Sequence, residues 1–203
     1  MTMKIHQQFI VVDGPNGVGK STIIDSIKSQ LNTTETDFIV TKEPTNTELG
    51  DFIRANQNVY WSKTLAALVA ADRYNHIEKL ITPALYQGKI VISDRYIASS
   101  LVYQVLDGLS YEFILHLNSE IILPSLYFIL AASPGTLSKR LNKRDSLTRF
   151  EVDKQADEGK LFAEAGKFLM QKGVVVHFVN NESRTTEETT REIMSKITQH
   201  LSG

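Results

Sequence analysis

Five short runs of the chain are rich in valine, isoleucine and phenylalanine and carry few polar residues. They are QFIVVD (8–13), FIVT (38–41), KIVISD (89–94), SLYFILAA (125–132) and VVVHFV (174–179). Most of them are apolar throughout and do not alternate with polar positions. Strands of a parallel sheet have this pattern because helices cover both of their faces. The runs therefore predict five strands of a mainly parallel sheet.

Longer segments with helical character separate these runs. The sequence predicts helices at about 19–31, 62–87, 110–120, 134–142, 150–172 and 184–201. Thr47 could also cap a short helix with Glu48 and Asp51 in its first turn. This alternation predicts an α/β fold in which helices pack on both faces of a five-stranded sheet, in three layers, α/β/α. Ligands of such sheets bind beyond the carboxyl ends of the strands. We therefore expect the functional residues directly after the strands.

Composition narrows the class of protein. The chain has 203 residues, of which 42% are hydrophobic, a length typical of one domain with a substantial core. Its formal net charge of −1 argues against DNA or RNA as the main partner. The absence of cysteine excludes disulfides and thiolate metal sites. The first apolar run is too short for a signal peptide, and no segment approaches the ~20 apolar residues of a membrane span, so we expect a cytoplasmic protein without a membrane partner.

A glycine-rich loop follows the first predicted strand and opens a helix. Its sequence, GPNGVGKS at 14–21, fits the pattern G-x-x-x-x-G-K-[ST], and this context disfavours a glycine-rich turn of no function. The glycines allow successive N–H groups to point at one anion, and the helix N-terminus adds a favourable field. Lys20 can reach the β- and γ-phosphates of a nucleotide, and the Ser21 hydroxyl can bind Mg²⁺. The predicted phosphate-binding residues are Gly14, Pro15, Asn16, Gly17, Val18, Gly19, Lys20, Ser21 and Thr22.

The third predicted strand ends at Asp94, which Arg95 follows. The Asp94 carboxylate could hold Mg²⁺ or accept a proton, and the planar Arg95 guanidinium could clamp an anionic acceptor. The alternative is a surface ion pair, which would stabilise the fold little. A phosphate loop in the same sheet favours the functional interpretation. After the second strand, Lys42 and Arg54 could bind phosphate in the same way or be solvated loop charges.

Two further segments carry charges whose role the pattern leaves open. Asp72 and Arg73 fall on or beside a mostly apolar helix face, either at its rim or inside a pocket. The segment 138–153 holds the cations Lys139, Arg140, Lys143, Arg144 and Arg149. A basic excursion between helices can act as a lid that closes over a transferring phosphoryl group. The alternative is the ordinary basic face of an amphipathic helix pair.

With these motifs in place, the chain resembles the thymidylate kinase family of P-loop kinases. The resemblance covers about residues 8–198 and rests on DGPNGVGKST, KEPTNTELGDFIR, LVAADRYNHIEKLITPALYQGKIVISDRYIASSLVYQ and PSLYFILAASPGTLSKRLNKRDSLTRFE. The third of these segments is the specific one, because many enzymes share a P-loop. The resemblance implies a single domain over 1–203 with the P-loop NTPase fold and a mobile lid at about 142–152. It also implies a homodimer.

Carried over residue by residue, the resemblance implies a role for each matched position. The loop would hold the ATP phosphates, Asp94 would serve Mg²⁺, Arg95 would bind the acceptor monophosphate and Arg73 would hydrogen-bond its base. The implied catalytic residues are Lys20, Asp94, Arg95, Arg144 and Arg149, the last two in a lid like that of the bacterial-type members. The implied acceptor-binding residues are Asn16, Lys42, Arg54, Val69, Arg73, Arg95, Ser99, Tyr103 and Gln104.

Three positions depart from the family pattern, all on the acceptor side. Asn16 stands where the family usually has an aspartate or glutamate that contacts the acceptor's 3′-hydroxyl, and it keeps a hydrogen-bond acceptor without the charge. Val69 stands where a phenylalanine usually stacks on the base, a change that would weaken base binding by ~1 kcal/mol or more. Lys42 replaces the arginine of T-R-E-P and offers a point charge in place of a bidentate clamp.

The residues and the resemblance together predict transfer of the γ-phosphoryl group of ATP to dTMP, giving dTDP, with Mg²⁺ as the metal. Two alternatives stay open. A related enzyme could act on another nucleotide or on a nucleoside, which the changes at Asn16 and Val69 motivate. The chain could also be a nucleotide-binding ATPase or switch module, whose turnover would not depend on an acceptor.

Overall fold

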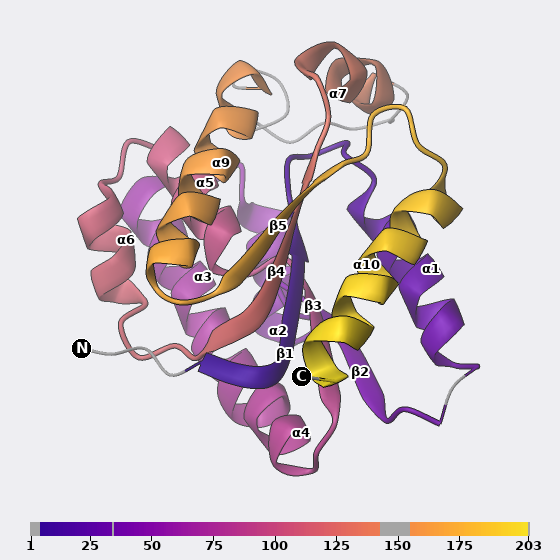
Figure 1. Ribbon diagram of the computed structural model, residues 1–203. Coiled ribbons are helices and arrows are strands. Elements are labelled where there is room, and N and C mark those ends of the chain that lie inside the picture. Colours follow the sequence, from indigo (N-terminus) through magenta and orange to yellow (C-terminus); the bar gives the residue numbers. More distant parts are fainter. Residues whose placement is uncertain (1–4, 34, 143–154, 203) are drawn as a thin grey trace.

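Five strands form one sheet at the centre of the computed structural model, which describes residues 5–33, 35–142 and 155–202 (Figure 1). They are β1 (Ile5–Asp13), β2 (Phe38–Lys42), β3 (Ile90–Asp94), β4 (Leu123–Ala131) and β5 (Val175–Asn180). All pairings are parallel, in the order β2-β3-β1-β4-β5. Asp94 of β3 lies opposite both Val12 of β1 and Lys42 of β2. The carboxyl ends of these three strands therefore meet at one edge of the sheet.

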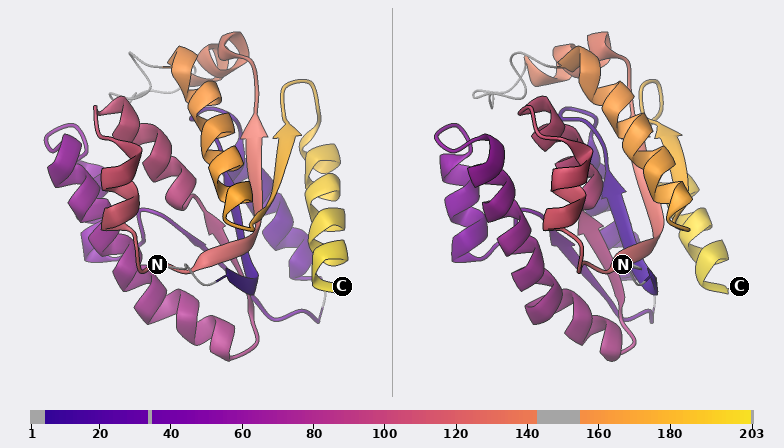
Figure 2. Two further views of the ribbon diagram at one scale, coloured as in Figure 1. Left: turned by 60° about the vertical axis from the view of Figure 1, so that its left-hand side comes forward. Right: turned by 90° about the vertical axis from the view of Figure 1, so that its left-hand side faces the viewer.

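Helices cover both faces of this sheet. They are α1 (Lys20–Leu31), α2 (Glu48–Asn56), α3 (Ser62–His76), α4 (Thr82–Tyr86), α5 (Ile97–Leu106), α6 (Tyr111–Leu117), α7 (Pro134–Leu141), α9 (Gln155–Gln171) and α10 (Thr186–Ser202). A π-helical turn, η1 (Ile77–Ile81), joins α3 to α4. α1 and α10 pack together on one face, and α3, α5, α6 and α9 lie on the other (Figures 1 and 2).

Alternate strand residues point into two separate hydrophobic cores. On β1, Phe9 and Val11 belong to the core beneath α3, α5 and α9, whereas Ile10 and Val12 belong to the core beneath α1 and α10. All four side chains are completely buried. Burial on both faces explains why the second half of β1 and most of β3 and β4 are mainly apolar, whereas β5, at the edge of the sheet, also carries exposed residues. The three-layer α/β/α fold with a five-stranded parallel sheet is thus confirmed.

The helices differ from the sequence prediction at two places. The pattern predicts no helix at 97–106, where α5 lies. Its N-cap, Tyr96, makes no side-chain capping bond, so the usual sequence signal for a helix start is missing. The single helix predicted at 62–87 is interrupted by the wider π turn η1, a local change in period that a hydrophobic pattern does not reveal.

Other predictions concern parts of the chain or properties that the fold does not address. The predicted lid lies, from residue 143 onward, outside the described residues, and the single-domain organisation over 1–203 stays a prediction. None of the helices in the described part of the chain combines the length and the apolar character that crossing a membrane requires.

Helix α9 packs closely against side chains of the sheet at Gly166. A Cβ atom at this position would lie 2.6 Å from Cζ of Phe178 and 2.8 Å from Cδ1 of Ile129. The same helix carries Gly159, where a Cβ would meet nothing within 4 Å. The two glycines therefore differ in packing while they share a helix.

This difference predicts opposite effects of alanine on stability. Gly166→Ala should lower the free energy of unfolding by about 1 kcal/mol, because displacing the Ile129 side chain and the Phe178 ring costs more than the helix preference of alanine contributes. Gly159→Ala should raise it by about 0.5–1 kcal/mol because alanine restricts the unfolded chain and favours the helix. Urea denaturation of the two variants and the wild type measures both changes. Stabilisation by Gly166→Ala would contradict the packing described here.

Candidate active site

The loop between β1 and α1 is shaped to surround an anion. Gly14, Gly17 and Gly19 have φ angles of 143°, 79° and 98°. A Cβ on Gly14 would lie 2.5 Å from the carbonyl oxygen of Leu130, so the close approach of the loop to β4 requires glycine. The N-cap of α1 is Gly19, which has no side chain that could occupy the first N–H groups of the helix. The first N–H groups of the helix can therefore serve a phosphate.

The Lys20 side chain is folded onto this loop. Its Nζ donates to the carbonyl oxygens of Gly14 and Pro15, each at 2.8 Å. Burial, followed by the positive charge of Arg95, lowers the pKa of Lys20 to about 7. Near pH 7 neither the ammonium form nor the neutral amine is therefore strongly favoured in the free protein, and a bound phosphate would favour the ammonium form.

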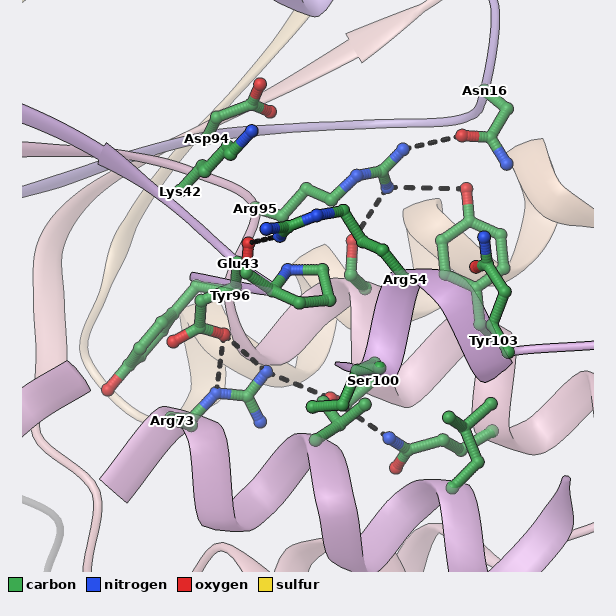
Figure 3. Close-up of a pocket in the computed structure, with 17 residues that line it drawn as sticks. Asn16, Lys42, Glu43, Arg54, Arg73, Asp94, Arg95, Tyr96, Ser100 and Tyr103 are labelled. Carbon is green, nitrogen blue, oxygen red and sulfur yellow. Dashed lines mark hydrogen bonds and ion pairs between the residues drawn. The ribbon is translucent and has the colours of Figure 1, made fainter. Parts of the chain in front are cut away.

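A cavity of about 400 Å³ opens beside the loop, at the ends of β2 and β3 (Figure 3). Its volume lies within the range of small-ligand sites. Ile53, Leu65 and Val69 give it an apolar side. The cavity brings together the predicted positions Asn16, Lys42, Arg54, Val69, Arg73, Asp94, Arg95, Ser99, Tyr103 and Gln104. Residues that are far apart in the sequence thus share one cationic, partly apolar cavity.

Arg95 lies where the cavity meets the phosphate loop. Its Nη2 donates to Oδ1 of Asn16 at 2.6 Å, and its Nη1 donates to Oγ of Ser99 at 3.0 Å. The guanidinium carbon lies 5.4 Å from the centre of the Tyr103 ring. The backbone of Arg95 has a φ of 71°, and its N–H donates to the carbonyl of Val12 at 3.0 Å. Both the main chain and the side chain of Arg95 are therefore fixed relative to β1 and its loop.

Arg73, which the pattern placed either at a rim or in a pocket, is buried with only 1% of its surface exposed. Its Nε donates to Oε2 of Glu43 at 2.9 Å, and its Nη1 donates to Oδ1 of Asn118 at 2.7 Å. Its Nη2 donates to Oγ of Ser100 at 3.0 Å. Glu43 thus balances the buried charge, and three partners fix the orientation of the guanidinium at the cavity wall. Asp72 is equally buried.

Asp94 presents a carboxylate to the same edge of the sheet. Its Oδ1 is buried and has no hydrogen-bond partner among the described residues. Burial raises the pKa of Asp94, while the charges of Arg95 and Lys20 oppose the rise. The described part of the chain contains no group of three or more histidine or acidic side chains that could hold a metal ion. A carboxylate with one unpartnered oxygen fits Mg²⁺, which proteins commonly hold through one or two side chains together with water and substrate phosphates.

Comparison with known proteins identifies the family. Residues 12–193 match the family model described as thymidylate kinase. The chain belongs to the thymidylate kinase family. It is 34% identical over 204 residues to a probable thymidylate kinase of Thermococcus onnurineus, and the aligned region covers 95% of this chain and 98% of the relative. It is 36% identical over 205 residues to a thymidylate kinase of Caldicellulosiruptor saccharolyticus, which spans 96% of this chain and 97% of that relative.

The three departures from the thymidylate kinase pattern all line the cavity. The Oδ1 of Asn16 already accepts a hydrogen bond from Arg95. Val69 packs against the small apolar cluster of Ile53 and Leu65 and leaves an aliphatic wall where the family usually has a ring. Lys42 lies opposite Asp94 at the end of β2. The departures therefore fall on the lining of one cavity and not on scattered surface positions.

Three acidic residues near the loop escape the sequence analysis. Asp13 and Glu43 adjoin the ends of β1 and β2, and their place at the carboxyl edge of the sheet is the signal that could have found them. Glu158 lies in α9 and accepts hydrogen bonds from the Asn16 N–H at 3.1 Å and the Tyr103 hydroxyl at 3.2 Å. Its helical surroundings give no comparable signal.

The predicted lid residues Arg144 and Arg149 lie outside the described residues.

ATP binding should take up a proton at Lys20. The pKa of Lys20 is about 7 in the free site, so the amine is mostly neutral at pH 8, and bound phosphates favour its charged form. Titration calorimetry of ATP in two buffers with different ionisation enthalpies measures this uptake. Lys20→Arg, whose guanidinium stays charged, is the matched control and should lack the contribution of Lys20. Equal uptake by the two proteins would contradict the assignment.

Proposed function

We propose that this chain transfers the γ-phosphoryl group of ATP to dTMP and releases ADP and dTDP. The observation that carries the proposal is the position of the acceptor cavity directly beside the phosphate loop, with Arg95 joined to Asn16 across their boundary. Membership of the thymidylate kinase family supports the same activity. An ATPase or switch module would have no use for a cavity of this size with a fixed cation at its mouth.

The reaction needs positioning and charge neutralisation more than covalent chemistry by the protein. A phosphate oxygen of dTMP attacks the γ-phosphorus in line, and the bond from that phosphorus to the β–γ bridging oxygen breaks, so its electrons leave with ADP. Lys20 would offset negative charge on the donor phosphates, and Arg95 would hold the acceptor phosphate. Both residues contact the loop through hydrogen bonds that already exist in the free protein.

The remaining assignments extend this proposal. Arg73 would present its fixed guanidinium to the thymine base, and Tyr103 with Gln104 would line the nucleoside. Asp94 and Ser21 would hold Mg²⁺, which supplies charge neutralisation at the nucleotide phosphates when it is bound. Arg144 and Arg149, by the resemblance, would add positive charge from a lid. The homodimer remains a prediction of the resemblance.

The decisive assay compares phosphoryl acceptors. With ATP and Mg²⁺, dTMP should give the highest kcat/KM in a panel that includes dUMP, dCMP, dGMP and thymidine, because the cavity holds both a cation for a monophosphate and a fixed donor for a base. Lys20→Ala should reduce the turnover of dTMP by about 100-fold or more and serves as the control for contaminating kinases. A dTMP rate no higher than that of the other acceptors would contradict the proposal.

Asn16→Asp tests the first departure from the family pattern. If Asn16 contacts the acceptor as a weaker hydrogen-bonding group, the carboxylate should raise kcat/KM for dTMP by roughly 5- to 10-fold, the size of a charge-assisted hydrogen bond. Steady-state kinetics with dTMP at saturating ATP measures the change. Loss of dTMP activity, or no change, would indicate that Asn16 suits a different acceptor.

A further inference from the structure

The first turn of helix α5 has its capping partners on two strands, β1 and β4. Its N-cap, Tyr96, makes no side-chain capping bond. Instead, the N–H groups of Tyr96 and Ser99 donate to Oδ2 of Asp13, at 3.3 Å and 3.1 Å. The N–H of Ala98 donates to the hydroxyl of Tyr127 in β4 at 3.1 Å. Groups that a helix normally leaves unsatisfied are thus satisfied across the sheet.

The same carboxylate also holds the phosphate loop. The N–H of Gly14 donates to Oδ1 of Asp13 at 2.8 Å, and so does the hydroxyl of Ser99, also at 2.8 Å. The Tyr127 hydroxyl donates to Oδ2 at 2.8 Å. Asp13 is completely buried and is surrounded by hydrogen-bond donors, which is the environment that an ionised carboxylate requires.

Arg95 lies between the two segments that Asp13 joins. It precedes the N-cap of α5 by one residue, and its guanidinium lies 3.9 Å from Oδ1 of Asp13. A shift of the α5 N-terminus relative to Gly14 would therefore move Arg95 relative to the donor loop. The negative charge of Asp13 also stabilises the positive end of the α5 dipole.

We propose that Asp13 is a positioning residue for phosphoryl transfer. It fixes the acceptor-binding Arg95 relative to the loop that holds the donor phosphates, and it does so without contacting either substrate. The inference rests on the proposed function, because only a reaction between two substrates needs the two halves of the site in a defined relation. Each half keeps its own binding groups, so Asp13 acts on the transfer step and not on the binding of either substrate.

Asp13→Asn tests this role. An asparagine amide must turn its NH₂ group toward donors on one side of the network, so at least one backbone N–H loses its acceptor. We expect kcat to fall by about 100-fold, the effect of a misplacement of about 1 Å, while the KM values for ATP and dTMP each change by less than about threefold. Gly166→Ala is the control, because its added methyl would contact Phe178 and Ile129 and none of the residues bonded to Asp13; its kcat per folded molecule should equal that of the wild type.

Tyr127→Phe keeps the experiment decisive if Asp13→Asn does not fold. This variant retains the carboxylate and removes one donor to it and the acceptor of the Ala98 N–H. It should show the same selective loss in kcat, of smaller size. A folded Asp13→Asn with wild-type kcat, or with a loss confined to KM, would overturn the inference. A wild-type protein inactive on dTMP would instead contradict the proposed function, so the two failures are distinguishable.

Discussion

The buried carboxylate of Asp13 is the interaction on which the rest of the site depends. A charge with no exposure is costly unless it is surrounded by donors, and here the donors come from the phosphate loop, the start of α5 and β4. These segments can satisfy the carboxylate only when they are all in their native places. The charge therefore couples the position of the phosphate loop to the position of the α5 N-terminus, which carries Arg95 directly before it. Gly14 contributes twice, through its N–H and through the small size that its approach to Leu130 requires.

The electrostatics of the site follow from where charge is balanced and where it is left over. The charge of Arg73 is balanced by Glu43 inside the protein, so Arg73 can give a ligand an oriented hydrogen-bond donor but little net charge. Lys20 is desolvated, and its Nζ donates hydrogen bonds to two loop carbonyl oxygens in the free protein. Arg95 donates hydrogen bonds to the neutral groups of Asn16 and Ser99 beside the cavity, and its guanidinium also lies 3.9 Å from the Asp13 carboxylate. A phosphate entering the site would complete the coordination of Lys20 and Arg95, which is a physical basis for drawing two anionic substrates together.

The strands and the phosphate loop could be predicted from the sequence, for identifiable reasons. The central strands β1, β3 and β4 were evident because burial on both faces makes them mainly apolar, and β2 and β5 were evident from their valine, isoleucine and phenylalanine. The loop was evident because its chemistry demands glycines and a lysine at fixed spacing. Helix α5 was missed because its capping groups lie on β1 and β4 and not in its own sequence. The burial of Arg73 was undecidable because its partners, Glu43 and Asn118, are 30 and 45 residues away in the chain. Pairings of this kind are made by tertiary structure, and a local pattern does not contain them.

We propose that one chain holds a donor site and an acceptor cavity side by side, so that the phosphoryl group passes directly between them. The most direct test is the binding of a bisubstrate compound in which adenosine and thymidine are joined by five phosphates, measured by titration calorimetry. We expect one molecule bound per chain, with an affinity at least about 100-fold higher than that of ATP or dTMP alone, because the second half binds intramolecularly. An affinity no higher than that of ATP alone would contradict it.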